Sequence, residues 1–248
     1  MLTNMSSSNE SRNILILGGS GKIARLATKM LIDAGHQVTS VIRDAAAAPE
    51  LEALGAQVEV CDITQAKAVQ WNKLQGDKDI VVWAAGLSKT SDATDAADAA
   101  DAAAAVRTLQ RDAPWSMIDS LNRFDDRPSG APLLIMLSYT GSLNNPWPKG
   151  DPKYAYGLAK QEVDRRLEAG VKFPFVVIAA GEIVDEATAG FESVADNAAA
   201  AGPTSRKLLA ELIVEIANRG KAAVPEEGIR LPLKNGTQPV ASLGYPVN

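Results

Sequence analysis

The stretch ILILGGSGKIA, residues 14–24, decides the fold of this chain. Its first four residues form an uninterrupted apolar run that ends in glycine, as a buried parallel strand does. From residue 22 onward, apolar side chains recur at helical spacing until Ala34-Gly35, where we expect the helix to end. The glycine-rich turn therefore lies between a first strand and a first helix. The N–H groups at the start of such a helix lack partners, and the positive end of its dipole faces the turn, so this turn is suited to phosphate binding.

Strand and helix patterns continue to alternate to the end of the chain, which predicts a Rossmann-type, doubly wound α/β fold with a parallel sheet covered on both faces. We expect a disordered polar tail over residues 1–12 and one dinucleotide-binding domain over 13–248, with substrate loops in its C-terminal part and a small C-terminal extension. The expected strands are 14–17, 38–42, 58–60, 80–83, 133–137, 175–178 and 229–233, and the expected helices are 22–34, 49–54, 66–74, 154–169 and 204–219.

Bulk composition excludes several classes of protein. The net charge of −5 over 248 residues argues against a nucleic-acid partner, which needs a basic face. No apolar run approaches the roughly 20 residues of a membrane helix, and the polar N-terminus does not resemble a signal peptide. A single cysteine, Cys61, cannot form an internal disulfide, and a single histidine, His36, leaves little for a zinc site. We therefore expect a cytoplasmic protein with a small-molecule substrate, no metal and no membrane contact, and we leave a homodimer open.

Residues 92–105 consist almost entirely of alanine and aspartate, with Asp92, Asp95, Asp98 and Asp101 three apart. A cation site is one interpretation. The run lacks the loop chemistry that brings metal ligands together, so we favour a solvated helix after the fourth strand.

The glycine turn has the spacing of a dinucleotide-binding fingerprint. Gly18 permits the tight turn, Gly21 lets the backbone approach a pyrophosphate, and Ala24 is small enough for the helix to pack close to the sheet. At the junction of the first strand and first helix, this pattern favours a bound nicotinamide dinucleotide over a turn without a ligand.

The end of the second strand indicates which dinucleotide is bound. NAD binders usually carry an acid there for the ribose 2′-hydroxyl, whereas this chain reads Arg43-Asp44. Arg43 can pair with a 2′-phosphate, assisted by Ser20 and Lys22, so we predict NADP(H) in preference to NAD(H). The alternative is a surface ion pair between Arg43 and Asp44.

These motifs resemble the atypical short-chain dehydrogenase/reductase group, and more narrowly its small NmrA-like and epimerase-like NAD(P)H-binding members. The resemblance runs through GGSGKIAR, VIRD, CDIT, WAAG, LSYTGS, YAYGLAK and VVIAAGEIVDEATAG to NGTQPV at 235–240. It implies cofactor contacts along the glycine turn and after strands two, three and four. The full set expected to contact the cofactor is Gly18, Ser20, Gly21, Lys22, Ile23, Arg43, Asp62, Ile63, Ala84, Ala85 and Gly86.

The resemblance also implies a catalytic serine, tyrosine and lysine, which match Ser138, Tyr156 and Lys160. In active members the tyrosine exchanges a proton with the substrate oxygen, the lysine lowers the tyrosine pKa and binds the nicotinamide ribose, and the serine holds the carbonyl. Independently of the family, Tyr156 and Lys160 are four apart on a predicted helix and share one face. A tyrosine and a lysine at this spacing can also be ordinary packing.

One departure bears on the substrate. The family often carries Arg-Pro after the sixth strand, and Ala179-Ala180 stands there instead. Three functions follow as hypotheses: an NADP(H)-dependent oxidoreductase that transfers hydride to or from a small carbonyl or hydroxyl compound with Tyr156 as acid/base; an NmrA-like dinucleotide-binding sensor; and a cofactor-dependent isomerase or epimerase.

Overall fold

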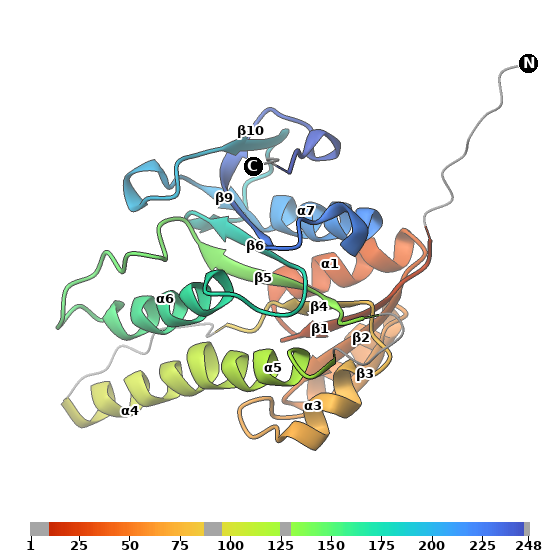
Figure 1. The fold of residues 1–248 in the computed structure, drawn as a ribbon, viewed down its shortest axis with the longest axis horizontal. Coiled ribbons are helices and arrows are strands. Elements are labelled where there is room, and N and C mark those ends of the chain that lie inside the picture. Colours follow the sequence, from red (N-terminus) through yellow and green to blue (C-terminus); the bar gives the residue numbers. More distant parts are fainter. Residues whose placement is uncertain (1–9, 87–95, 125–129, 246–248) are drawn as a thin grey trace, which may run out of the picture.

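The computed structural model describes residues 10–86, 96–124 and 130–245. They form an eight-stranded sheet with helices on both faces, and a separate two-stranded sheet (Figure 1). The strands are β1 Asn13–Leu17, β2 Gln37–Ile42, β3 Gln57–Val60, β4 Ile80–Trp83, β5 Leu133–Tyr139, β6 Phe175–Ala180, β7 Ile183–Val184, β8 Gly190–Ser193, β9 Thr204–Ser205 and β10 Ile229–Gly236. The helices are α1 Lys22–Asp33, α2 Ala48–Ala53, α3 Ala68–Gln75, α4 Ala96–Arg107, α5 Ala113–Leu121, α6 Tyr154–Glu168 and α7 Arg206–Arg219, with a π-helical turn, η2, over Thr108–Asp112 between α4 and α5.

The main sheet has the strand order β3-β2-β1-β4-β5-β6-β10-β8. Every neighbouring pair is parallel except β10 and β8 at the edge. The chain starts in the middle of the sheet, winds outward through β2 and β3, and returns to β4 on the other side of β1. This is the doubly wound Rossmann arrangement that the sequence predicts, and the point where the winding reverses lies beside β1.

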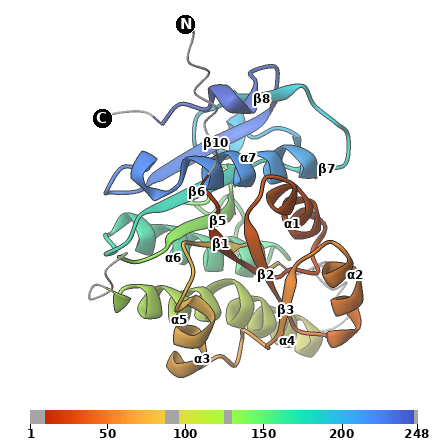
Figure 2. The same ribbon diagram turned by 90° about the vertical axis from the view of Figure 1, so that its right-hand side faces the viewer.

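The strand residues alternate between two hydrophobic cores, one on each face of the sheet. Ile14 and Ile16 pack with α1 and α7, whereas Leu15 and Leu17 pack with α3, α5 and α6. Figures 1 and 2 show α1 and α7 side by side on one face and the other three helices on the opposite face. Because both faces are covered, the central strands are apolar throughout, which is why they were recognisable in the sequence.

The sequence analysis missed several elements. It placed no helix over 113–121, no strand over 190–193, and no small parallel pair like that of β7 and β9. β8 extends the sheet antiparallel to β10, so the purely parallel sheet that we expected has one antiparallel edge strand. Strands this short carry too little periodicity to be detected, and β8 is exposed over its second half.

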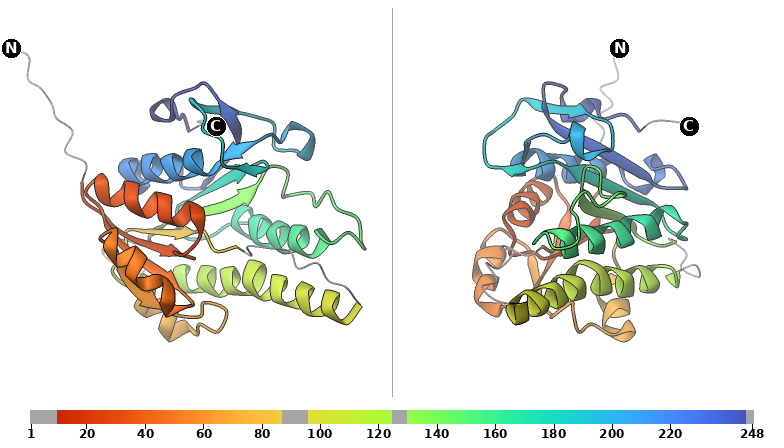
Figure 3. Two further views of the ribbon diagram at one scale, coloured as in Figure 1. Left: turned by 180° about the vertical axis from the view of Figure 1, so that it is seen from behind. Right: turned by 90° about the vertical axis from the view of Figure 1, so that its left-hand side faces the viewer.

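Residues 96–105 of the alanine- and aspartate-rich run lie in α4, and Figure 3 shows from behind that α4 continues into α5. Asp92 and Asp95 lie outside the described residues, and Asp101 is exposed. The predicted tail also lies outside them up to residue 9. Arg12, at its end, donates to the backbone carbonyl of Asn218 at 3.1 Å, so this residue is held against α7. In the described ranges, no helix combines the length and apolarity needed to cross a bilayer.

Candidate functional site

A cleft of about 760 Å³ opens beyond the carboxyl ends of β1, β2, β4, β5 and β6. Ligands of open α/β sheets bind at this place, beside the strand where the winding reverses. The cleft is lined by all eleven residues that we predicted to contact a cofactor and by all three predicted catalytic residues. Its volume lies within the range of small-molecule and cofactor sites.

The glycine turn closes one end of the cleft. The N–H groups of Gly18 and Gly19 donate to the carbonyl of Val41 at 3.2 and 2.9 Å, which fixes the turn to the end of β2. Gly18 has φ +83°, and a Cβ at this residue would lie 2.5 Å from the Cα of Ala85, so only glycine fits. This close approach of β1 to β4 brings Ala84, Ala85 and Gly86 to the cleft wall.

Helix α1 begins at the glycine turn without a capping side chain. Gly21 is the N-cap residue, and the first turn of α1 contains no acidic residue. The open N–H groups and the positive helix end therefore face the cleft. A Cβ on Gly21 would lie 3.2 Å from the carbonyl oxygen of Gly18, which is a tight contact, and Gly21 itself lines the cleft. The turn fits a dinucleotide pyrophosphate.

Arg43 and Asp44 are exposed at the end of β2 and differ in their contacts. A carboxylate oxygen of Asp44 accepts from the N–H of Ala46 at 2.9 Å and caps a short 3₁₀ turn. No hydrogen bond or ion pair of the Arg43 side chain is found within the described part of the chain, and the surface pair with Asp44 that we considered as the alternative does not form. Arg43 is available to an anion at the cleft rim.

Asp62 and Ile63 follow β3 at the same rim. One Asp62 carboxylate oxygen accepts from the N–H and the hydroxyl of Thr64, at 3.0 and 2.7 Å, so this aspartate shapes its own loop. Ile63 is buried and lines the cleft with an apolar side chain.

Tyr156 and Lys160, four residues apart on α6, both line the cleft. The Lys160 ammonium is almost fully buried and donates to the carbonyl of Leu137 at 2.8 Å. Burial lowers the pKa of Lys160 to about 8, against an opposing effect of the Asp164 charge. The two residues share a wall of the cleft, but Lys160 is directed to the backbone of β5.

The pKa of Tyr156 is not lowered in this structure, contrary to our expectation. Burial, assisted by the negative charge of Asp164, raises the pKa of Tyr156 to about 12. The lysine four residues away is visible in the sequence, whereas the burial of Tyr156 and the effect of Asp164, eight residues further along the same helix face, depend on the fold.

Ser138 lies in the cleft wall but is turned toward the protein interior. Its hydroxyl donates to a carboxylate oxygen of Asp164 at 2.5 Å, and the Ser142 hydroxyl donates to the same oxygen at the same distance. The expectation that Ser138 holds a substrate carbonyl therefore conflicts with the hydrogen bond that this serine makes. A charge-assisted bond of this kind is stronger than one between neutral groups.

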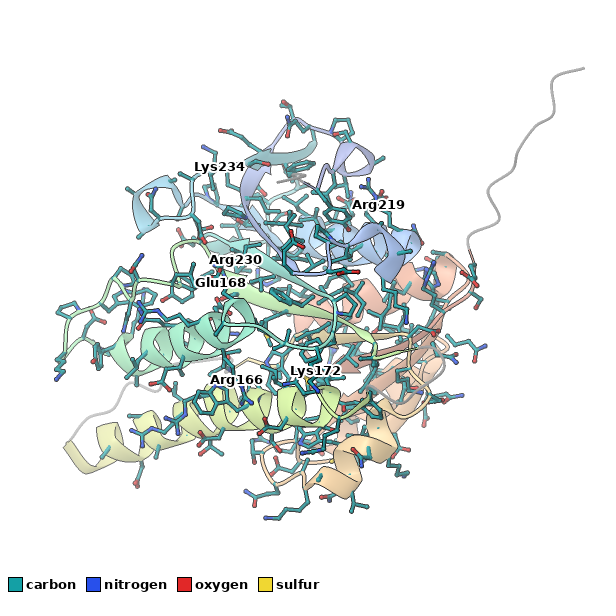
Figure 4. All side chains as sticks on the ribbon, viewed as in Figure 1. Arg166, Glu168, Lys172, Arg219, Arg230 and Lys234 are labelled. Carbon is teal, nitrogen blue, oxygen red and sulfur yellow. The ribbon has the colours of Figure 1, made fainter. Side chains whose placement is uncertain are left out.

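Asp164 is the centre of a buried polar cluster between α6 and β10. The side chain of Arg230 donates to Asp164 at 3.0 Å, to Asp196 at 2.9 Å and to the Ser142 hydroxyl at 2.9 Å. Arg230 also lies 3.5 Å from Glu168, and these two residues are labelled side by side in Figure 4. The cluster ties the helix that carries Tyr156 and Lys160 to the far edge of the sheet.

Gln110, Tyr139 and Arg206 are among the cleft residues that were not predicted from the sequence. Gln110, on the π-helical turn, is buried, and its amide nitrogen donates to the carbonyl of Ala85 at 3.4 Å. Tyr139 follows Ser138 and lies beside Tyr156. Arg206, the first residue of α7, also lines the cleft, and its guanidinium pairs with the carboxylate of Asp185. A π-helical turn is frequent at functional sites, but nothing in the sequence marks one in advance.

Comparisons with known proteins agree with this geometry. Residues 18–123 match the family model described as NAD(P)H-binding. Over 74 residues the sequence is 32% identical to the UPF0659 protein C216.03 of Schizosaccharomyces pombe, a match that covers 29% of this chain and 30% of that protein. The chain thus aligns with less than a third of the length of this curated relative.

Solved structures share the fold over nearly the whole chain. A putative NAD-dependent epimerase/dehydratase from Bacillus halodurans superposes with a TM-score of 0.73 at 19% identity, covering 93% of this chain and 97% of that one. The oxidoreductase ylbE from Lactococcus lactis gives a TM-score of 0.69 at 15% identity, with 92% and 93% covered. Residues 18–123 thus match an NAD(P)H-binding domain, and the solved structures show the Rossmann-like α/β fold that the sequence predicted.

Proposed function

We propose that this protein is an NADP(H)-dependent oxidoreductase that transfers a hydride to or from a small carbonyl or hydroxyl compound, with Tyr156 as the acid/base. The observation that carries the proposal is the cleft itself. The uncapped start of α1, the cationic rim and the Tyr156–Lys160 pair all face one cavity at the carboxyl end of the sheet. A binding turn and a proton-transfer group are thus available to the same ligand.

The residues of the cleft divide into a binding part and a reacting part. The first N–H groups of α1 would bind the pyrophosphate beside Gly18 and Gly21, whose own N–H groups donate to Val41 and Gly18, and Lys160 would bind the nicotinamide ribose. When bound, the nicotinamide supplies or accepts the hydride. Tyr156 would give its proton to the substrate oxygen in reduction and take it back in oxidation.

The preference for NADP(H) is proposed on the contrast between Arg43 and Asp44. The acidic side chain that could bind a 2′-hydroxyl already caps a turn, whereas the neighbouring guanidinium is exposed and uncommitted. A guanidinium pairs with a phosphate through two charge-assisted hydrogen bonds, which a 2′-hydroxyl cannot match.

Turnover and binding must be measured separately to test this function. NADPH and NADH are titrated against the purified protein by nicotinamide fluorescence, and NADPH oxidation is followed against a panel of aldehydes and ketones. Tyr156→Phe is compared with Tyr154→Phe, which removes a hydroxyl from the same helix at a residue that is not among those lining the cleft. We expect only Tyr156→Phe to abolish turnover while NADPH binding is kept. Equal turnover by both variants would refute the role of Tyr156.

One observation favours a second candidate, a dinucleotide-binding sensor of the NmrA-like kind. The pKa of Tyr156 is raised to about 12 and the Ser138 hydroxyl is bonded to Asp164, so the two groups are not arranged for catalysis in the absence of ligand. A sensor needs the glycine turn but not the tyrosine. Saturable NADPH binding at micromolar concentration with no turnover of any carbonyl compound would favour the sensor.

A further inference from the structure

We propose that Trp147 is a positioning residue for Tyr156, which holds the tyrosine ring in place from behind the cleft wall. The indole lies in the loop between β5 and α6 and acts on the cleft through its aromatic neighbours. This inference rests on the proposed role of Tyr156 as the acid/base. It concerns a residue to which neither the resemblance nor the comparisons assign a role.

Trp147 forms an aromatic cluster with two tyrosines. Its ring centroid lies 6.4 Å from that of Tyr156, with 62° between the planes, and 5.2 Å from that of Tyr139, with 54° between the planes. Both tyrosines line the cleft, whereas Trp147 is not among the described residues that do. Rings in tilted or edge-to-face contact attract each other, because the positive edge of one ring meets the negative face of the other. The indole therefore restricts the tilt of the Tyr156 ring without lining the cleft itself.

Gly157, which follows Tyr156 near the start of α6, makes room for the indole. A Cβ at this residue would lie 2.6 Å from Cε3 of Trp147 and would also collide with the side-chain amide of Asn145. Glycine is less favourable than alanine inside a helix, because it loses more conformational freedom on folding. The close approach of the loop accounts for a glycine at this position.

Hydrogen bonds fix the same loop to α6 on both sides of the proposed acid/base. The amide nitrogen of Asn145 donates to the carbonyl of Tyr154 at 3.1 Å, and Oδ1 of Asn145 accepts from the N–H of Trp147 at 3.2 Å. Further along the helix, the amide nitrogen of Gln161 donates to the carbonyl of Leu143 at 2.7 Å. The indole and the phenol are therefore held together through the loop as well as through their rings.

The position of the Tyr156 hydroxyl matters because proton transfer requires it within hydrogen-bond reach of the substrate oxygen. A misplacement of about 1 Å can lower a rate on the order of 100-fold. Removing the indole gives the Tyr156 ring space to rotate, but it leaves the glycine turn and the Arg43 side chain as they are. We therefore expect the loss in kcat and not in cofactor binding.

The test compares Trp147→Leu with Trp115→Leu. Both indoles lie beside a cationic side chain, since Lys153 Nζ is 5.8 Å from the Trp147 ring centroid and the Arg166 guanidinium is 5.0 Å from that of Trp115. Trp115 lies on α5 and is not among the described residues that line the cleft. We expect Trp147→Leu to lower kcat about 10- to 100-fold, with KM for the carbonyl compound and Kd for NADPH unchanged. Trp115→Leu should keep the wild-type kcat.

Two more variants separate positioning from a general loss of structure. Trp147→Phe, which keeps a ring beside Tyr156, should recover most of the lost kcat. Gly157→Ala keeps the indole but displaces it, so its kcat should fall as that of Trp147→Leu does, with NADPH binding again unchanged. If Trp147→Leu does not fold, Gly157→Ala decides the matter alone.

The assignment is overturned if Trp147→Leu or Gly157→Ala retains the wild-type kcat, or if Trp147→Phe is as slow as Trp147→Leu. A loss of NADPH affinity in proportion to kcat would also overturn it, because the indole would then support the cofactor site. Failure of the proposed function looks different. In that case the wild type reduces no carbonyl compound, or Tyr156→Phe reduces it at the wild-type rate, and the positioning role fails with the function.

Discussion

Replacing Arg230 with methionine should destabilise this protein more than any exposed substitution of a charged residue. Asp164 is completely buried, and the Arg230 side chain, itself 10% exposed, is the only ion-pair partner of Asp164 among the described residues, since Lys160 interacts with its charge without forming a direct pair. Methionine keeps most of the side-chain volume but leaves the carboxylate without an ion pair. Breaking a buried pair in this way costs about 3–5 kcal/mol. The two serine hydroxyls that donate to Asp164 cannot neutralise its charge.

That cost translates into a melting temperature lowered by roughly 6–20 °C, since about 1 kcal/mol corresponds to 2–4 °C in a chain of this size. Thermal and urea unfolding followed by circular dichroism measure the change. Lys29→Met is the control, because the Lys29 and Asp33 side chains are each 61% exposed. We expect their ion pair to contribute less than about 1 kcal/mol to the free energy of unfolding. Arg230 also pairs with Asp196 and Glu168, which are more exposed and can be solvated when the arginine is removed.

A second substitution isolates the charge of Asp164. In the Arg230→Met background, Asp164→Asn removes the uncompensated charge while keeping an acceptor for the two serines, so it should restore part of the lost stability. Asp164→Asn alone should destabilise, since it leaves the Arg230 charge less well paired. The reasoning is refuted if Arg230→Met melts within about 2 °C of Lys29→Met, or if the double variant is as unstable as the sum of the two single ones.

Three further predictions concern the cleft. Arg43→Ala should weaken NADPH binding about 10- to 100-fold, the equivalent of one charge-assisted contact of about 1.5–3 kcal/mol. NADH binding, measured by the same fluorescence titration, should be unchanged. An equal loss of affinity for both cofactors would contradict a contact between Arg43 and the 2′-phosphate. Gly21→Ala should keep the melting temperature within a few degrees of wild type yet impair cofactor binding. Gly18→Ala, whose Cβ would lie 2.5 Å from the Cα of Ala85, should destabilise the fold itself. A lower melting temperature for Gly21→Ala than for Gly18→Ala would show that we have misassigned the two glycines. Burial lowers the pKa of Lys160 from 10.5 to about 8. Between those two pH values, Lys160 is protonated in the unfolded chain and deprotonated in the folded chain. Its contribution to the free energy of unfolding therefore rises from pH 8 to pH 10. The unfolding free energy of wild type minus that of Lys160→Met should therefore increase over this interval, and a difference independent of pH would show that Lys160 keeps its ordinary pKa.

The fold and half of the site were predictable because their signals are local. Apolar runs identify the central strands of a sheet buried on both faces, and the glycine spacing identifies the turn between β1 and α1. The i,i+4 spacing placed Tyr156 and Lys160 on one face of α6, since helix geometry alone relates residues four apart. These features depend on neighbours within a few residues, so the sequence by itself determines them.

Only the tertiary structure decided what the catalytic candidates contact. Ser138 meets Asp164 26 residues away, and Asp164 meets Arg230 66 residues further along. Neither separation along the chain corresponds to the repeat of a helix or a strand. Those contacts depend on the order of β5, β6 and β10 in the sheet and on the packing of α6 against it, which many distant residues set together. The same packing raises the pKa of Tyr156, because burial is a property of the assembled core and not of any segment within it.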